Sequence, residues 1–195
     1  MAKKIVLSIS AAFFVLILWG CKSLQGKMEP ISRNLADSGI KNAKQLHKFF
    51  MDSNPLADSE QVFRMARTYI TEAKTEGINS DCAFVQMCLE TGFLRFGGLV
   101  TPDMHNYCGL GSIDADHRGE CFETEELGIR AHIQHLHAYA TSEDVSLVNE
   151  CIDNRYKWVR PRGKATDVFG LTKTWASDPD YGTKLDSLLS RLEEY

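Results

Sequence analysis

Glu90 is the side chain in this sequence best placed to transfer a proton. A helix is expected over residues 82–90, and on it Glu90 follows Ala83 and Met87 at the spacing that puts all three on one apolar face. Glu90 also falls in the last helical turn, where the helix dipole is negative. Burial and the dipole both disfavour the carboxylate and should raise its pKa. A carboxyl that stays protonated near neutral pH is what a general acid needs to protonate a glycosidic oxygen.

Two structural interpretations compete with this role. Glu90 would be a surface residue near a helix C-terminus, or it would pair with Gln86, four positions earlier. The position of Glu90 alone favours these structural interpretations. The motifs around it, described below, favour the catalytic role instead.

The histidines at positions 132, 135 and 137 raise the question of a metal site. His132 and His135 are three positions apart on an expected helix and share a face. The sequence contains no HExxH or CxxC pattern, and its spacing fixes no acidic partner for them. We therefore expect hydrogen-bonded histidines, an internal ion pair for Arg130, and no bound metal.

Helices must position these side chains, and the apolar periodicity predicts six of them. They cover residues 42–54, 58–77, 82–90, 124–140 and 143–154, and a last one opens at Asp178-Pro179 and carries Leu185, Leu188, Leu189 and Leu192 on one face. Residues 96–122 are rich in Gly and Asp without helical periodicity, which predicts loops with at most a short hairpin. The expected fold is mainly α with one irregular lobe, in a single domain.

The N-terminus predicts export. Lys3 and Lys4 precede an apolar run over residues 5–19, which is typical of a secretory signal and too short for a comfortable membrane span. Residues 18–21 (LWGC) also resemble a bacterial lipobox, which implies a signal peptide over residues 1–20 and a lipid on Cys21. An ordinary signal peptide and an uncleaved anchor are the alternatives. Lys22 after the cysteine favours the outer membrane, facing the periplasm.

Residues 21–40 are then expected to be the lipidated cysteine and a polar tether, with the folded domain over residues 41–195. The formal charge of −4 is mild and predicts no nucleic-acid partner. The remaining cysteines are Cys82, Cys88, Cys108, Cys121 and Cys151. An exported chain can keep disulfides. Cys108 with Cys121 is our preferred pair, because this bond would cross-link the loop between two helices.

Four motifs in order resemble the glucosaminidase family of bacterial cell-wall hydrolases. Residues 84–93 (FVQMCLETGF) are similar to its Q-x-x-x-E-[ST]-G-[WF] segment, whose catalytic Glu ends a helix. Residues 106–111 (NYCGLG) are similar to its N-[NLF]-x-G-[IL]-G turn, and residues 128–140 match the helix behind the cleft. Residues 175–181 (WASDPDY) resemble its closing [YW]-A-[ST]-D-P-x-Y motif. With minor matches, the resemblance extends over about residues 41–193.

This resemblance implies a lysozyme-like α+β fold that is mainly helical, with a two-lobed cleft and a small irregular or β lobe. It implies an endo-β-N-acetylglucosaminidase that hydrolyses β-1,4 bonds at N-acetylglucosamine in peptidoglycan. Glu90 would be the general acid, and no metal or organic cofactor is implied.

The resemblance leaves the second catalytic group open. Members often place an acidic residue in the small lobe about thirty positions after the catalytic Glu. Asp114, Asp116, Glu120 and Glu123 lie in that region, and we favour Glu120. Tyr181 is a further candidate, because the closing motif brings an aromatic hydroxyl near the cleft. A water held by other groups is the remaining alternative, and the choice between retention and inversion stays open.

Side chains in the matched motifs are also candidates for binding sugar. Aromatic faces pack against the apolar faces of pyranose rings, although any one aromatic residue is more often part of a core. The candidates are Gln86, Phe93, Phe96, Asn106, Tyr107, Trp158 and Trp175, with Phe93 and Tyr107 preferred for the cleft.

Two other functions remain open at this point. A lytic transglycosylase uses a similar lone Glu but forms an anhydro product instead of adding water. A catalytically silent lipoprotein would bind glycan strands and hold the envelope together, although retention of Glu90 speaks against it.

Overall fold

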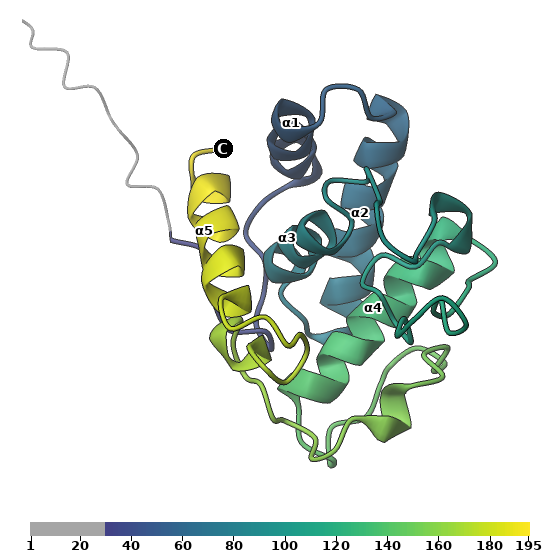
Figure 1. The fold of residues 1–195 in the computed structure, drawn as a ribbon. Coiled ribbons are helices and arrows are strands. Elements are labelled where there is room, and N and C mark those ends of the chain that lie inside the picture. Colours follow the sequence, from purple (N-terminus) through teal and green to yellow (C-terminus); the bar gives the residue numbers. More distant parts are fainter. Residues whose placement is uncertain (1–29) are drawn as a thin grey trace, which may run out of the picture.

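The computed structural model describes residues 30–195, so the predicted signal peptide and Cys21 lie outside the described residues. Within this range the chain forms five α-helices and three short 3-10 helices (Figure 1). They are α1 Ala43–Ser53, α2 Ser59–Glu76, α3 Ser80–Glu90, η1 Pro102–Met104, α4 Glu125–Ala140, η2 Tyr156–Trp158, η3 Phe169–Leu171 and α5 Tyr181–Glu193. Strand pairing in residues 30–195 is limited to two isolated bridges. No helix in this range is long and apolar enough to cross a membrane.

Side-chain caps begin the first four α-helices. Asn42, Asp58, Asn79 and Thr124 each accept hydrogen bonds from backbone N–H groups of the first turn. Such caps satisfy donors that have no partner inside the helix. Gly77 ends α2 in the left-handed conformation, with φ of 68°. These signals are local in the sequence, which is why the helix starts agree with prediction to within about two residues.

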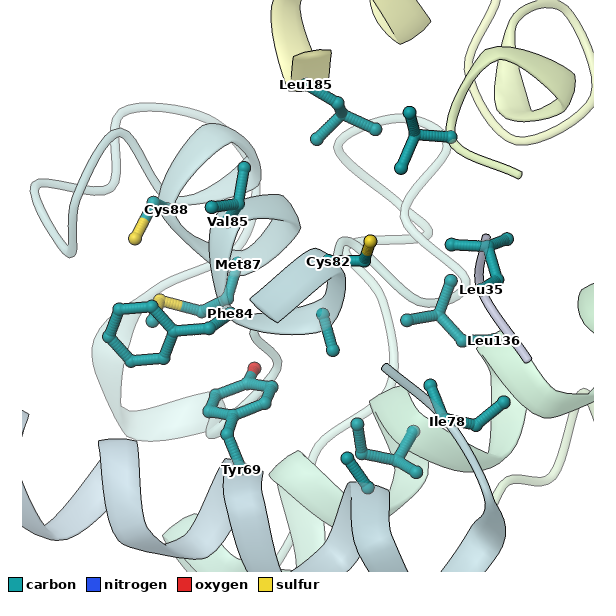
Figure 2. Close-up of a cluster of buried hydrophobic side chains, with 14 of the residues drawn as sticks. Leu35, Tyr69, Ile78, Cys82, Phe84, Val85, Met87, Cys88, Leu136 and Leu185 are labelled. Atoms are coloured by element: carbon teal, nitrogen blue, oxygen red, sulfur yellow. The ribbon is translucent and has the colours of Figure 1, made fainter. Parts of the chain in front are cut away.

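Helix α3 runs through the centre of the molecule (Figure 1). Every residue from Ser80 to Cys88 is buried, so the helix has no solvent-exposed face along most of its length. Its side chains meet Tyr69 of α2, Leu136 of α4 and Leu185 of α5 in one core (Figure 2). Because its body is enclosed by the other helices, the end of α3 is a rigid support for the residue that follows the core, Glu90.

The helix predicted over residues 143–154 is absent; that segment forms turns and loops. Several of its backbone N–H groups bond to side chains of distant residues instead of to carbonyls one turn earlier. Glu76 accepts from Val148 and Asn149 at 2.8 and 2.9 Å. Gln134 accepts from Ile152 at 2.9 Å. These long-range acceptors replace the helical ladder, and the periodicity of the segment could not reveal them.

The packed part of the chain begins near residue 31, and not at residue 41 as the sequence predicted. Ile31 and Leu35 are buried, with exposed fractions of 3% and 1%. Arg33 forms ion pairs with Asp186 and Glu193 of α5. Scattered apolar residues without a period looked like a tether, but two of them fill positions in the core.

The preferred disulfide between Cys108 and Cys121 is not present. All five cysteines between residues 30 and 195 carry free thiols. Cys108 is buried whereas Cys121 is exposed, so the two side chains lie in different environments.

Candidate active site

A short turn after α3 fixes the position of Glu90. The Thr91 hydroxyl donates to the Met87 carbonyl at 2.8 Å and accepts from the Leu94 N–H at 2.9 Å. Gly92 has φ of 57°, and Phe93, Leu94 and Phe96 are also left-handed, at 57°, 58° and 46°. Non-glycine residues seldom adopt this conformation, so the turn holds local strain next to the carboxylate.

Glu90 lies at the surface of a cavity of about 320 Å³. The segment over residues 96–100 forms one part of its wall, and Trp175 and Ala176 form another. Thr91, Asn106, Cys108, Gly109 and Ser112 complete the lining. Of the described residues that line it, Glu90 alone carries a carboxylate.

Two donors hold one oxygen of Glu90. Trp175 donates its indole N–H to Oε1 at 3.0 Å, and the Tyr181 hydroxyl donates to the same atom in a short hydrogen bond. Gln86 in turn donates from Nε2 to the Tyr181 oxygen at 2.8 Å. The loop before α5 and its first residue thus meet the end of α3 at this carboxylate.

The other oxygen, Oε2, lies beside Gly109. A Cβ on Gly109 would be 3.9 Å from Oε2, so the glycine leaves the space next to this oxygen open. Oε2 makes no hydrogen bond to any side chain or backbone group of residues 30–195. The carboxyl group therefore has one anchored oxygen and one that is free to face a ligand.

The pKa of Glu90 is raised above its usual value. Removal of water by the surrounding protein is the main cause, and the hydrogen bonds from Tyr181 and Trp175 offset part of it. The Glu90 side chain is still open to solvent on the cavity side. Burial and the negative charge of Glu90 both raise the pKa of Tyr181, so that its hydroxyl stays a donor at neutral pH. The direction expected for Glu90 from the sequence is confirmed.

Several residues expected in the site are brought together around Glu90. Tyr181 and Trp175 contact its carboxylate, Gln86 contacts Tyr181, and Phe96 lines the cavity. Asn106 also lines it, but its side chain organises the loop: it donates to the carbonyls of residues 110 and 120 at 2.9 and 3.0 Å and accepts from the Leu110 N–H.

The two aromatic residues preferred for the cleft belong to the core. Phe93 packs against Phe49 and Phe50, with ring centroids 5.7 and 5.4 Å away, and Tyr107 is only 2% exposed. The left-handed turn, with φ of 57° at Phe93, directs this ring inward. Trp158 is 69% exposed and does not line the cavity.

Glu120 is not among the residues that line the cavity. Its carboxylate lies against Gly111, where a Cβ would be 3.3 Å from Oε1, and near Arg155. The sequence predicted Glu120 as a second catalytic group, and its place outside the cavity wall does not favour that role.

The three histidines of α4 bond to different side chains and share none of them. His132 bonds to Tyr69 and Gln86, His135 to Asp153 at 2.7 Å, and His137 to Tyr156 at 3.0 Å. Residues 30–195 contain no group of three or more potential metal ligands.

Arg130 pairs with Glu72 through two bonds of 2.9 Å, which confirms the expected internal ion pair.

Sequence reasoning missed the cavity wall at Gly97, Gly98, Leu99 and Val100, and it missed Tyr69 behind the site. The wall has no periodic pattern, and Tyr69 belongs to an apolar stripe that predicts core alone.

Comparisons with known proteins identify the family and the fold. The family model described as mannosyl-glycoprotein endo-beta-N-acetylglucosaminidase, or Glucosaminidase, matches residues 66–194. A protein of Borreliella burgdorferi, described as uncharacterized, is 38% identical over 161 residues, which is 83% of this chain and 78% of that protein. The structure of S. aureus autolysin E in complex with the muropeptide NAM-L-Ala-D-iGlu has a TM-score of 0.53 and 10% identity over 86% of this chain and 74% of the autolysin chain. This likeness shows the expected lysozyme-like fold, which is mainly α with an irregular small lobe.

Proposed function

The chain belongs to the glucosaminidase family, and we propose that it is a peptidoglycan hydrolase that cuts β-1,4 bonds at N-acetylglucosamine, with Glu90 as its general acid. The single observation that carries this proposal is the difference in surroundings between the two oxygens of the Glu90 carboxyl group. Oε1 accepts two hydrogen bonds, while Oε2 faces the open space beside Gly109. A proton on the carboxyl group then resides on Oε2, where a glycosidic oxygen in the cavity can receive it.

The reaction follows from that proton. Glu90 transfers it to the glycosidic oxygen as the C1–O bond breaks, and the leaving sugar departs as an alcohol. A water molecule then adds to C1 and gives its proton to the Glu90 carboxylate, which restores the acid. Tyr181 and Trp175 stabilise the carboxylate in between, since both donate to Oε1.

Peptidoglycan is the favoured substrate over other N-acetylglucosamine polymers for two reasons. Autolysin E, which shares the fold, is described in complex with a muropeptide. The sequence also predicts export to the bacterial envelope, the compartment that contains peptidoglycan.

The test is the identity of the product. A form of the chain that begins at residue 22 is incubated with purified peptidoglycan, and the products are reduced with borohydride and read by mass spectrometry. New fragments that end in reduced N-acetylglucosamine are expected. Glu90→Gln is the matched control, because it keeps the shape of the side chain and removes its acidic proton. Fragments ending in reduced N-acetylmuramic acid would refute the proposed bond specificity.

One observation keeps a lytic transglycosylase as the second candidate. Glu90 is the single carboxylate among the described residues of the cavity wall, and a lone Glu suffices when a hydroxyl of the substrate attacks C1 in place of water. Anhydro ends in the same experiment would move the chain to that class. If both the wild type and Glu90→Gln sediment with the cell wall but release nothing, the silent glycan-binding function replaces both.

We propose in addition that the protein is anchored by a lipid on Cys21 to the outer membrane, facing the periplasm. Cells grown with labelled palmitate should incorporate the label into the wild type and not into Cys21→Ser, which should also leave the membrane fraction. Labelling of the Cys21→Ser protein would rule this anchor out.

A further inference from the structure

We propose that a buried hydrogen-bond chain, from Tyr69 through His132 and Gln86 to Tyr181, sets the direction in which Tyr181 bonds to Glu90. Tyr69 and His132 are then positioning residues of the active site, although neither lines its cavity. The inference rests on the proposed role of Glu90 as the acid.

The hydrogen-bond chain connects four helices, α2, α4, α3 and α5, behind the site. The Tyr69 hydroxyl of α2 lies 3.0 Å from Nδ1 of His132, on α4. Nε2 of His132 lies 3.0 Å from Oε1 of Gln86, on α3. Gln86 donates to Tyr181 at 2.8 Å, and Tyr181 donates to Glu90. Tyr69, His132 and Gln86 are at most 1% exposed, so water does not replace any of these bonds.

Tyr69, at the end of the hydrogen-bond chain, decides the direction in which its groups donate. With every group donating toward Glu90, all the bonds named above are made. In the reversed order Gln86 would be flipped, Tyr181 would donate to Gln86, and the carboxyl proton of Glu90 would be held on Oε1 by Tyr181. His132 would then donate to Tyr69, whose own hydroxyl hydrogen has no acceptor among residues 30–195. Burying an unsatisfied hydroxyl donor is costly, so the forward order is favoured.

His132 is suited to this task because it stays neutral. Its complete burial lowers its pKa to about 3. A neutral ring has one donor and one acceptor nitrogen, and acceptance from Tyr69 at Nδ1 leaves Nε2–H to donate to Gln86. The ring also packs against Trp175, the second donor to Glu90, with centroids 6.0 Å apart. One histidine thus supports both groups that hold Oε1.

Two matched substitutions test the chain. Tyr69→Phe removes the terminal hydroxyl, so neither direction is favoured any longer. On solubilised, uncrosslinked glycan strands, kcat should fall about three- to tenfold, the size of one hydrogen bond, with KM unchanged. The alkaline limb of the pH profile should move to higher pH, because Glu90 loses part of the donation that favours its charged form. Tyr156→Phe is the control, because it removes a similar bond to His137 that does not lead to Glu90.

A measurement without catalysis separates this inference from the proposed function. In the wild type, nitrogen NMR should show His132 with a proton on Nε2 and none on Nδ1 throughout pH 5–8. Carbon NMR of the Glu90 carboxyl group should show a higher pKa in Tyr69→Phe and no change in Tyr156→Phe. Both results are readable even if no glycan is cut. A proton on Nδ1 of His132, or equal effects of the two substitutions, would overturn the proposal.

Discussion

Tyr181, the first residue of α5, donates a hydrogen bond to Oε1 of Glu90, the last residue of α3, across 91 positions of sequence. Trp175 donates to the same oxygen from the loop before α5. The carboxyl group is thereby oriented with Oε2 toward the cavity. The first predictions below concern the groups that produce this arrangement.

Tyr181→Phe should slow the reaction and shift its pH dependence. The hydroxyl favours the carboxylate of Glu90, so its loss raises the Glu90 pKa further. Since the acid works in its protonated form, activity falls as pH rises through that pKa. The alkaline limb should therefore move to higher pH, while kcat falls about tenfold or more. A limb that stays in place would show that Tyr181 does not act on Glu90.

Trp175→Phe removes the indole N–H but keeps an aromatic ring among His135 and Tyr139. We expect a several-fold fall in kcat, because one donor to Oε1 remains. Trp158→Phe is the matched control, since Trp158 is exposed and lies outside the cavity wall. Steady-state kinetics on glycan strands compares the two. If the two variants lose activity equally, Trp175 does not have the role described here.

Glu120→Gln tests the second carboxylate. Because Glu120 lies against Gly111 and is not part of the cavity wall, we expect activity within about threefold of the wild type, less than the effect of one full hydrogen bond. A loss of about a hundredfold would establish Glu120 as a catalytic group. The stereochemistry of the first product, followed by NMR, would then decide between retention and inversion.

Gly128→Ala should destabilise the fold where α4 meets the loop that carries the site. A Cβ at position 128 would lie 1.8 Å from the His105 carbonyl oxygen, and backbone must shift to relieve that contact. Overpacking of this kind costs about 1–3 kcal/mol or more, readable as a lower midpoint in thermal or urea unfolding. Gly98→Ala is the control, since a Cβ there meets nothing within 4 Å. Equal midpoints for the two variants would mean that the close approach at Gly128 is relieved without cost.

Features of the fold that depend on neighbouring residues were predictable from the sequence, and features that depend on distant residues were not. Asn42, Asp58, Asn79 and Thr124 act on their own helices, so their pattern is local and the helix starts were predictable. Glu90 was identified because a helix end and four ordered motifs agree. The absent helix over residues 143–154 depends on Glu76 and Gln134, which are distant in sequence and give no periodic signal.

Within the site, residue types were predictable and their contacts were not. Trp175 was expected in the site and does line the cavity, but the bond from its N–H to Glu90 was not predicted. Tyr107 was expected in the cleft, yet it is buried in the core. His132 was weighed as a metal ligand, and Tyr69 lay in the helix predicted over residues 58–77 without a role of its own. Their shared hydrogen bond joins α2 to α4 and exists only once the helices pack.

The most direct test of the central claim is the turnover of Glu90→Gln on purified glycan strands. General acid catalysis contributes about 10² to 10⁴ in rate, so kcat should fall at least about a hundredfold. Binding to the strands and the unfolding midpoint should stay close to those of the wild type, because the amide keeps the size and the anchored oxygen of the side chain. Turnover within about tenfold of the wild type would contradict the account, since Glu90 would then not supply the proton on which it depends.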